Sequence, residues 1–472
     1  MNKKTKIVAT ISDLRCSTDF IKTLYEAGMN VVRLNTAHQD LEASLKIIKN
    51  VREVSDKIPI MIDTKGPEIR TSAVTEKIQV KKDDIISVKG GNADSISTPN
   101  CIYVSYIDFA KEVPVGGCIL IDDGALELIV EKIENDTLKC RVKNDGTIGN
   151  KKSVNVPAVS FKLPALNVKD KSYLDFAITN DIDFIAHSFV RNKEDIIEIQ
   201  DYLRTHDSRI KVIAKIENQE GVDNIEEILD YAYGIMIARG DLGIEIAFEK
   251  IPGIQRMLIN KCIERRKPVI VATQMLHSMT DQPRATRAEV SDVANAIFSC
   301  ADAIMLSNET TTGKYPKEAV ETMARIAEEV ELTSLDKLDI PVKVLSTETS
   351  AFLSKSAVEA AMRLDAKIII ADTTTGRTIR NMSGFRGKKL IYAMCYDRRV
   401  ARELALSFGV YAYFIESKAS FDFLTLSLNK LISAGALTEK DKVVVLGGNF
   451  GTSHGASHIE ISTVENLNQK RN

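Results

Sequence analysis

Short apolar runs recur through the first two thirds of the chain, and most are followed by polar residues and a stretch with helical spacing. Eight runs stand out: KIVATI, NVVRLN, IPIMID, DFIAHSF, KVIAKIE, GIMIARG, PVIVATQ and ADAIMLS. Short apolar runs that alternate with helices predict a parallel sheet. Eight such units fit a closed (β/α)8 barrel, although a doubly wound open sheet explains the alternation about as well.

Two stretches depart from this rhythm. Residues 66–160 give short alternating runs separated by Gly, Asn and Asp, which predict an all-β insertion without a helix of any length. After about residue 335 the alternation resumes with KIIIADTTTG, LIYAMCY, YAYFIES and KVVVLGG, which predicts a separate α/β domain. We therefore expect a TIM-barrel catalytic domain at 1–65 and 161–335, an inserted β-barrel lid domain at 66–160, and a C-terminal α/β domain, a candidate for regulation, at 336–472.

Composition narrows the class of protein. The 472 residues include 63 Lys and Arg against 65 Asp and Glu, so there is no general attraction to nucleic acid or anionic membrane. No apolar run approaches the roughly 20 residues that cross a bilayer, and polar residues interrupt the N-terminal stretch MNKKTKIVATISD, which argues against a secretory signal. Seven scattered cysteines without a CxxC pair indicate reduced thiols. We expect a cytoplasmic protein with neither nucleic-acid nor membrane partners.

Polar residues gather where the predicted strands end. In a (β/α)8 barrel the active site lies at the carboxyl ends of the strands. Six of these ends carry polar or charged pairs: Arg33 and Asn35, Asp63 and Thr64, Lys215 and Glu217, Arg239 and Asp241, Thr273 and Gln274, and Ser307 and Glu309. A single charge at a strand end is usually solvated, but a converging set of both signs requires mutual pairing, a metal or a charged ligand.

Two of these ends predict a metal site. Glu217 and Asp241 end adjacent predicted strands, and oxygen ligands of this kind suit Mg²⁺. A salt-bridge network with the neighbouring Arg and Lys side chains is an equally good explanation, and the absence of a His/Cys cluster disfavours zinc. Arg33, Lys215 and Arg70 supply the cations that a phosphoryl group needs. The peptide GDLG opens a predicted short helix whose free N–H groups could hold an anion.

Several strings resemble the pyruvate kinase family. They are GMNVVRLN, DTKGPEIR, KIENQEG, MIARGDLGIE, VATQML, TRAEVSDVANA and GKYP, and they follow that family's order, with the all-β lid after the third strand. The resemblance implies a (β/α)8 TIM barrel with an inserted small all-β lid domain and a C-terminal α/β domain. It also implies transfer of a phosphoryl group from phosphoenolpyruvate to ADP with Mg²⁺, giving pyruvate and ATP in glycolysis.

The resemblance further implies a role for each matching residue. Lys215 would neutralise the transferring phosphoryl group and the enolate, Arg33 would bind the phosphoryl group, and Thr273 would lie where the methyl proton arrives. Gly240 and Asp241 would bind the substrate carboxylate. The remaining implied assignments are Glu217 and Asp241 as Mg²⁺ ligands, Asn35, Asp63 and Thr64 as K⁺ ligands, and Asn35, His38 and Arg70 as nucleotide-binding residues.

Some positions depart from the family pattern. Ala37, in RLNTAHQD, stands where family members carry a serine whose hydroxyl helps to bind potassium, whereas Glu68 resembles the glutamate of potassium-dependent members. We expect potassium dependence with weakened binding. Asp13, in TISDLR, replaces the proline of the family's TIGP loop, so the nucleotide preference stays open.

The C-terminal part resembles the family's regulatory domain more loosely. The stretch TTTGRT resembles its phosphate-binding loop for an allosteric effector, with donors at Thr373, Thr375, Gly376, Arg377 and Thr378. A phosphorylated effector and a vestigial turn are equally good interpretations. The closing loop GGNFGTSHGA lacks the Trp and Arg that bind fructose 1,6-bisphosphate in responsive members. By resemblance the protein is expected to be a homotetramer.

Two further functions compete with phosphoryl transfer. A lyase on the same barrel could use two carboxylates and Mg²⁺ to stabilise a pyruvate enolate, although Arg33, Arg70 and the lid favour phosphoryl transfer. A non-catalytic regulatory paralogue is favoured slightly by the altered nucleotide loop but disfavoured by the intact Lys215, Glu217, Asp241 and Thr273.

Overall fold

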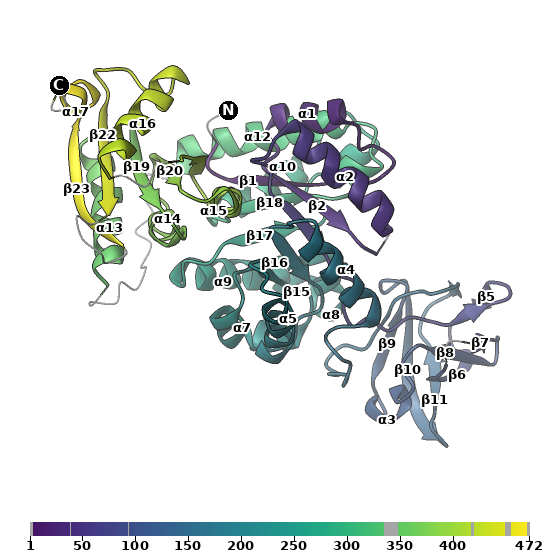
Figure 1. Cartoon of the computed structure of the whole chain (residues 1–472). Helices are drawn as coiled ribbons and strands as arrows, with labels where there is room; N and C mark the ends of the chain where they lie inside the picture. Colours follow the sequence, from purple (N-terminus) through teal and green to yellow (C-terminus); the bar gives the residue numbers. More distant parts are fainter. Residues whose placement is uncertain are drawn as a thin grey trace.

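The computed structural model describes residues 3–37, 39–92, 94–334, 348–416, 420–448 and 455–469. The chain forms three bodies in a row, with a barrel in the middle, a β-rich lid at one end and an α/β domain at the other (Figure 1). The chain enters the lid after Ile60–Asp63 (β3) and returns to the barrel at Val168–Thr179 (α4), which lies at the lid end of the barrel (Figure 1).

Eight parallel strands close into a barrel in the order β1-β18-β17-β16-β15-β14-β3-β2. Their bounds are Lys6–Thr10 (β1), Val31–Asn35 (β2), Ile60–Asp63 (β3), Phe184–His187 (β14), Lys211–Ile216 (β15), Gly234–Ala238 (β16), Val269–Ala272 (β17) and Ala303–Leu306 (β18). Each strand lies within one of the eight apolar runs. The expected TIM barrel is therefore confirmed over the open sheet, because hydrogen bonds between β1 and β18 close the ring.

The barrel strands are apolar on both faces because both faces are buried. Alternate residues such as Val8, Phe184 and Met236 fill the interior, and their neighbours pack outward against the helices. The covering helices are Thr18–Ala27 (α1), Leu41–Val54 (α2), Val168–Thr179 (α4), Lys193–Thr205 (α5), Ile225–Tyr231 (α7), Ile251–Glu264 (α9), Arg287–Phe298 (α10) and Pro316–Ser334 (α12). Side chains at several N-termini, Ser17 before α1 and Asp40 before α2 among them, accept a backbone N–H and fix where the helix begins.

The lid has its own apolar core. Its strands are Ala73–Val74 (β4), Ile78–Val80 (β5), Ile85–Gly90 (β6), Ile96–Ser97 (β7), Cys101–Val104 (β8), Cys118–Ile121 (β9), Leu126–Glu134 (β10), Thr137–Val142 (β11), Gly146–Ile148 (β12) and Val154–Asn155 (β13). They pair as β13-β9-β10-β11-β6-β8, β12-β5 and β4-β7. The all-β lid expected of the insertion is present, and Phe109–Glu112 (α3) adds one short helix that the alternating pattern did not indicate.

The C-terminal domain is a five-stranded sheet in the order β21-β20-β19-β22-β23. Its strands are Ile368–Thr373 (β19), Leu390–Cys395 (β20), Val410–Phe414 (β21), Lys442–Gly448 (β22) and the antiparallel Ala456–Thr463 (β23), which the sequence pattern did not single out. Its helices are Thr349–Arg363 (α13), Arg377–Gly384 (α14), Arg398–Leu404 (α15), Ser420–Ser433 (α16) and Val464–Gln469 (α17). The expected boundary at 335/336 lies outside the described residues.

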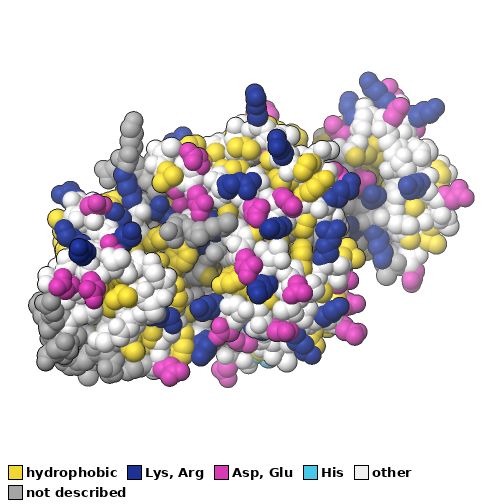
Figure 2. All heavy atoms as spheres, turned by 90° about the horizontal axis from the view of Figure 1, so that it is seen from above, with side chains coloured by type: hydrophobic (Ala, Val, Ile, Leu, Met, Phe, Trp, Pro, Cys, Tyr) yellow, Lys and Arg dark blue, Asp and Glu magenta, His cyan; other side chains and the backbone are white. Residues whose placement is uncertain are grey.

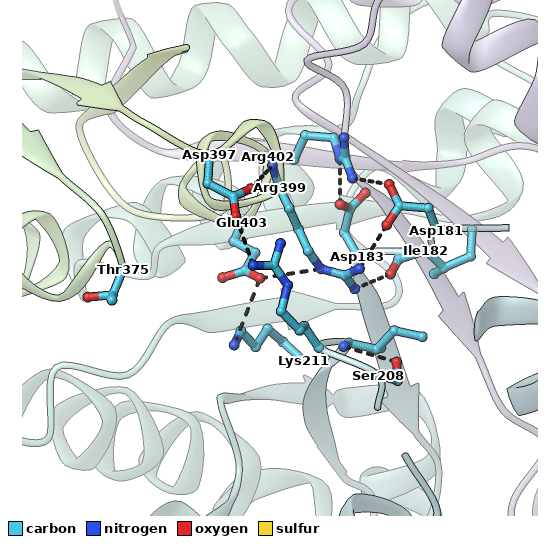
Figure 3. Close-up of polar contacts among 12 residues, drawn as sticks. Asp181, Ile182, Asp183, Ser208, Lys211, Thr375, Asp397, Arg399, Arg402 and Glu403 are labelled. Carbon is cyan, nitrogen blue, oxygen red and sulfur yellow. Dashed lines mark hydrogen bonds and ion pairs between the residues drawn. The ribbon is translucent and has the colours of Figure 1, made fainter. Parts of the chain in front are cut away.

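Helix α15 docks the C-terminal domain on the amino ends of the barrel strands. Arg399 and Arg402 reach from α15 to the carboxylates of Asp181 and Asp183, just before β14 (Figure 3). Asp183 is fully buried, and its carboxylate also accepts the backbone N–H of Ile60 at 2.9 Å. The C-terminal domain therefore lies at the end of the barrel opposite to the lid. Among the described residues, no helix combines the length and apolar character needed to cross a membrane.

Candidate active site

A buried cluster of charged and hydroxyl side chains lies at the carboxyl ends of β3 and β15. The Lys215 Nζ is 3.0 Å from the Glu217 Oε1 and 3.1 Å from the Asp63 Oδ1. Lys215 and Glu217 lie two positions apart at the end of one strand, so they project to the same side and meet. A third contact joins the Lys215 Nζ to the Ser188 Oγ at 2.6 Å.

Arg33 completes the charge balance of this cluster. Its Nε and Nη2 lie 2.7 and 2.6 Å from the Asp63 Oδ2, and its Nη1 donates to the Thr10 Oγ1 at 3.0 Å. Burial would raise the pKa of Asp63, but Arg33 and Lys215 outweigh burial and lower it. Asp63 is therefore a carboxylate that holds two cations in place at the mouth of the barrel.

Glu217 and Lys215 stabilise each other's charge in a site shielded from water. Burial would lower the pKa of Lys215, but Asp63 and Glu217 raise it above the ordinary value, so the ammonium stays charged. Burial raises the pKa of Glu217, with a further rise from Asp241 that opposes the effect of Lys215. The Glu217 Oε2 accepts the backbone N–H of Phe189 at 2.7 Å. A further cation close to Glu217 and Asp241 would relieve the remaining repulsion between these carboxylates.

The donor set around Glu217 fits a magnesium ion. Asp241 lies on Arg239–Glu245 (α8), directly after β16, which is the neighbour of β15. The described residues contain no group of three or more His, Cys, Asp or Glu side chains arranged to hold a metal. Two carboxylates alone suit an ion that takes its other oxygens from substrate and water, as Mg²⁺ commonly does.

Thr273 is brought to α8 by a strained turn. Thr273 and Gln274, directly after β17, have φ angles of 69° and 53°, values that residues with a side chain rarely adopt. The Thr273 Oγ1 accepts the backbone N–H of Gly240 at 2.8 Å and lies 2.6 Å from the Ala272 carbonyl oxygen. Strain of this kind persists at functional sites because the surrounding structure compensates for it.

The predicted potassium ligands lie together, but several of their oxygens are already hydrogen-bonded. The Asn35 Oδ1 accepts the backbone N–H of Ala37 at 3.1 Å, and the Thr64 carbonyl oxygen lies 2.8 Å from the Ser188 Oγ. Register places Asn35 beside Asp63 on neighbouring strands. Asn35 and Asp63 are therefore neighbours whose oxygens, with those of Thr64, could be offered to a monovalent cation, whereas Ala37 has no side-chain oxygen to contribute.

The nucleotide-side residues lie at the base of the lid. The Arg70 Nη2 pairs with the Glu68 Oε1 at 2.5 Å, and the Arg70 Nη1 donates to the Lys151 carbonyl oxygen at 2.7 Å. His38 lies outside the described residues. A cavity of about 420 Å³ separates lid from barrel, and Glu68, Phe161 and Asp241 contribute to its lining. On the face shown in Figure 2, Lys and Arg side chains are interspersed with Asp and Glu, in keeping with the overall charge balance.

Two strand-end charges do not join the cluster. The Arg239 Nη1 pairs with Asp292 at 2.7 Å, and its Nη2 donates to the Thr273 carbonyl oxygen at 2.8 Å, so Arg239 supports the strained turn. Glu309 is 2% exposed and accepts the backbone N–H groups of Ser307 and Leu276. The prediction that these two side chains belong to the converging cluster was wrong. Arg239 is bound by Asp292 of a barrel helix and by a backbone carbonyl, and Glu309 is bound by backbone N–H groups.

Ser188 was missed by the sequence analysis. It follows β14 as the other site residues follow or end their strands, but the end of β14 was not among the six predicted strand ends. The run DFIAHSF carried the available signal, because its Ser188 stands just past the last residue of the strand.

The predicted effector loop, residues 373–378, links β19 to α14. The Thr373 Oγ1 accepts the backbone N–H of Gly376 at 2.8 Å, and Gly376 has a φ of 79°. Arg377 pairs with Glu348 at 2.5 Å, Thr375 is exposed, and Thr378 is 9% exposed. The loop is an ordered turn whose Arg377 side chain is engaged by a neighbouring carboxylate. Most of the loop GGNFGTSHGA lies outside the described residues.

These features define a (β/α)8-barrel enzyme with a charged, metal-competent site beneath an inserted lid. Residues 2–320 match the model of the pyruvate kinase barrel domain, and residues 352–462 match that of the pyruvate kinase alpha/beta domain. The chain belongs to the pyruvate kinase family and is a phosphotransferase of that kind. The resemblance, the fold class and the expected function are thereby confirmed.

Individual relatives support the same conclusion. Pyruvate kinase of Borreliella burgdorferi is 46% identical over 100% of both chains, and that of Bacillus licheniformis is 42% identical over 98% of this chain and 80% of its own. The crystal structure of a pyruvate kinase from Cryptosporidium parvum superposes with a TM-score of 0.92 at 35% identity, covering 98% of this chain and 96% of that one.

Proposed function

We propose that this chain transfers the phosphoryl group of phosphoenolpyruvate to ADP in the cytoplasm, with Lys215 as its central catalytic group. The position of Lys215 carries the proposal, because its ammonium, whose pKa is raised by Asp63 and Glu217, is buried 3.0 Å from Glu217, one of the two carboxylates that fit Mg²⁺. In this reaction the bond between phosphorus and the enol oxygen breaks, and a terminal oxygen of ADP forms the new bond. The enolate left behind takes a proton at its methylene carbon to give pyruvate.

The other site residues take roles that suit their chemistry. Arg33 binds the phosphoryl group, and the backbone at Gly240 and Asp241 binds the substrate carboxylate. Thr273 faces the carbon that is protonated. Bound at Glu217 and Asp241, Mg²⁺ supplies positive charge to the substrate oxygens. The site is shielded from water, so Lys215 and Arg33 stabilise the negative charge that develops on the substrate more strongly than they would in solvent.

The nucleotide and the monovalent cation have separate assignments. We assign Asn35, His38 and Arg70 to ADP, and Asn35, Asp63 and Thr64 to K⁺. We also propose the same three domains: the catalytic barrel at 1–65 and 161–335, the lid at 66–160 and the C-terminal domain at 336–472. It also includes a homotetramer and a phosphorylated effector held at Thr373, Thr375, Gly376, Arg377 and Thr378.

Steady-state formation of pyruvate from phosphoenolpyruvate and ADP, with Mg²⁺ and with or without K⁺, tests the proposal. Turnover stimulated by K⁺ is expected. Turnover that is indifferent to K⁺ would remove the monovalent site but keep the enzyme. Absence of turnover in both conditions, also with GDP, would favour the regulatory paralogue, and activity on a hydroxy-oxo acid instead would favour the lyase.

The metal assignment gives a sharper expectation. Asp241→Asn removes a charged oxygen ligand and is expected to lower turnover at least about 100-fold, a loss near 2.7 kcal/mol of transition-state stabilisation. The melting temperature should stay within about 2 °C of the parent. Asp230→Asn, which removes an exposed carboxylate paired with Arg265, is the matched control. Unimpaired turnover of Asp241→Asn would refute the assignment.

A further inference from the structure

We propose that Ser188 positions the side chain of Lys215 for phosphoryl transfer, a role that rests on the function proposed above. Ser188 directly follows β14 and is 2% exposed. Its Oγ lies 2.6 Å from the Lys215 Nζ, the shortest of the three side-chain contacts that this ammonium makes. An ammonium has three N–H donors, so Ser188, Asp63 and Glu217 together satisfy all of them.

Ser188 differs from the other two partners because it is uncharged. In the proposed reaction the ammonium acts on the phosphoryl group, and Glu217 would be a ligand of a bound Mg²⁺. A hydroxyl accepts a hydrogen bond from the ammonium without neutralising its charge. Ser188 can therefore keep the amine in place while the charge remains available to the substrate.

The hydroxyl of Ser188 is itself fixed. Its oxygen lies 2.8 Å from the Thr64 carbonyl oxygen and 3.1 Å from the Asp63 Oδ1, and its single proton goes to one of these acceptors. The backbone N–H of Ser188 donates to the Thr64 Oγ1 at 3.2 Å. With the proton committed to an acceptor, a lone pair of the oxygen faces the Lys215 Nζ.

The residue after Ser188, Phe189, contacts Glu217, the carboxylate that pairs with Lys215. Phe189 has a φ of 56°, an uncommon value for a bulky side chain, and its N–H donates to the Glu217 Oε2 at 2.7 Å. Consecutive residues of one strained turn thus contact Lys215 and Glu217. The turn fixes the separation of these two groups through short, direct hydrogen bonds.

The same turn touches the hinge of the lid, a name we give to Lys65 and Gly66, from which the chain leaves the barrel for the lid. Gly66, three residues after β3, has a φ of 70°, and a Cβ atom there would lie 2.7 Å from the Ser188 carbonyl oxygen and 2.9 Å from its Cβ. Only glycine allows the hinge backbone to approach Ser188 so closely. Ser188 is therefore packed between the base of the lid and the catalytic lysine.

Ser188→Ala tests the proposal, with Ser44→Ala as the matched control. Ser44 is 1% exposed in the same barrel, and its hydroxyl donates to the Asp40 carbonyl oxygen and also contacts the Tyr173 side chain. Ser188→Ala is expected to lower kcat about 10- to 100-fold, the range for a lost hydrogen bond to a charged group. The KM for phosphoenolpyruvate and its Kd by calorimetry with Mg²⁺ should change less than about threefold, because Arg33 and the backbone at Gly240 and Asp241 are the groups assigned to substrate binding.

The outcomes separate positioning from a structural role. A kcat for Ser188→Ala within about twofold of Ser44→Ala would overturn the proposal. A lower melting temperature with parallel losses of kcat and phosphoenolpyruvate affinity would also overturn it, because a distorted barrel mouth impairs binding too. Turnover of the unsubstituted chain is measured first. Its absence counts against the proposed function, whereas an active parent with an unimpaired Ser188→Ala counts against the positioning role alone.

Discussion

Lys6 lies at the start of β1, fully enclosed where the barrel meets the C-terminal domain. Its Nζ donates to the Val410 carbonyl oxygen at 2.6 Å and lies 4.3 Å from the centre of the Tyr411 ring. Burial, reinforced by Lys3, lowers the pKa of Lys6 to about 7, while Glu331 and Asp302 oppose the shift. Between this value and the ordinary 10.5 the unfolded chain binds a proton that the folded chain releases. Stability therefore rises with pH across that window.

Lys6→Met should remove this dependence. The free energy of unfolding of Lys6→Met minus that of the parent is expected to be largest at pH 7 and to fall towards pH 10, because the parent gains stability over this range. The decline should be at most about 1.4 kcal/mol per pH unit. Denaturant titrations at pH 7, 8.5 and 10 measure this difference. Lys57→Met, at an exposed lysine 5.2 Å from the Tyr413 ring, is the control. Parallel curves for Lys6→Met and the parent would contradict the expectation.

Helix α4 shows how one element can serve both local and long-range structure. Its first turn is a capping box, in which Asn167 and Asp170 bond each other's backbone N–H groups. The Asp170 carboxylate is fully buried and also accepts the N–H groups of Lys65 and Gly66 at 2.9 and 3.2 Å. The cap of a barrel helix thereby holds the hinge from which the lid begins.

Asp170→Asn should loosen this hinge. An amide keeps one acceptor oxygen but turns its NH₂ towards backbone donors, so a loss of about 1–3 kcal/mol in unfolding free energy is expected. Amide hydrogen exchange at Lys65 and Gly66 should become faster. Asp175→Asn, an exposed substitution on the same helix, should change stability by no more than about 0.5 kcal/mol. Unchanged exchange at the hinge in Asp170→Asn would contradict this account.

The whole molecule is held together by charges buried between its domains. Leu406 of the C-terminal domain packs in the apolar cluster that fills the barrel interior, and Arg386 pairs with Asp302 with both side chains almost fully buried. A second buried pair joins the same two domains, with the Arg402 Nε 2.6 Å from the Asp183 Oδ1. Through its backbone and carboxylate Asp183 bonds β3 and β15, the strands that carry Asp63 and Lys215.

Arg402→Gln should weaken the attachment of the C-terminal domain. Removal of one partner leaves Asp183 buried with less compensation, and a loss of about 3–5 kcal/mol is expected for a pair of this kind. Arg398→Gln is the matched control on the same helix, because Arg398 and Asp56 form an exposed pair worth at most about 1 kcal/mol. Calorimetry should show an earlier transition in Arg402→Gln alone. Equal effects of the two substitutions would refute the importance of burial.

The sequence by itself determined the architecture and the location of the chemistry. Eight apolar runs separated by helical stretches indicated the parallel strands, because strand and helix periods are local properties of the chain, and the resemblance to the pyruvate kinase family favoured a closed barrel over an open sheet. The two-residue spacing of Lys215 and Glu217 placed both side chains on one face. Strand-end positions located most of the cluster, since all parallel strands end at one side of a barrel.

Only the tertiary structure decided which charges pair. Lys215 meets Asp63 across 152 residues and Ser188 across 27, and Arg402 meets Asp183 across 219. Arg239 and Glu309 occupy strand ends as the site residues do, yet they support the backbone instead. A buried charge takes the partner that lies within hydrogen-bonding distance, and that distance depends on how remote segments pack. The positioning turn at Ser188 and the buried contacts between domains therefore became visible only in the folded chain.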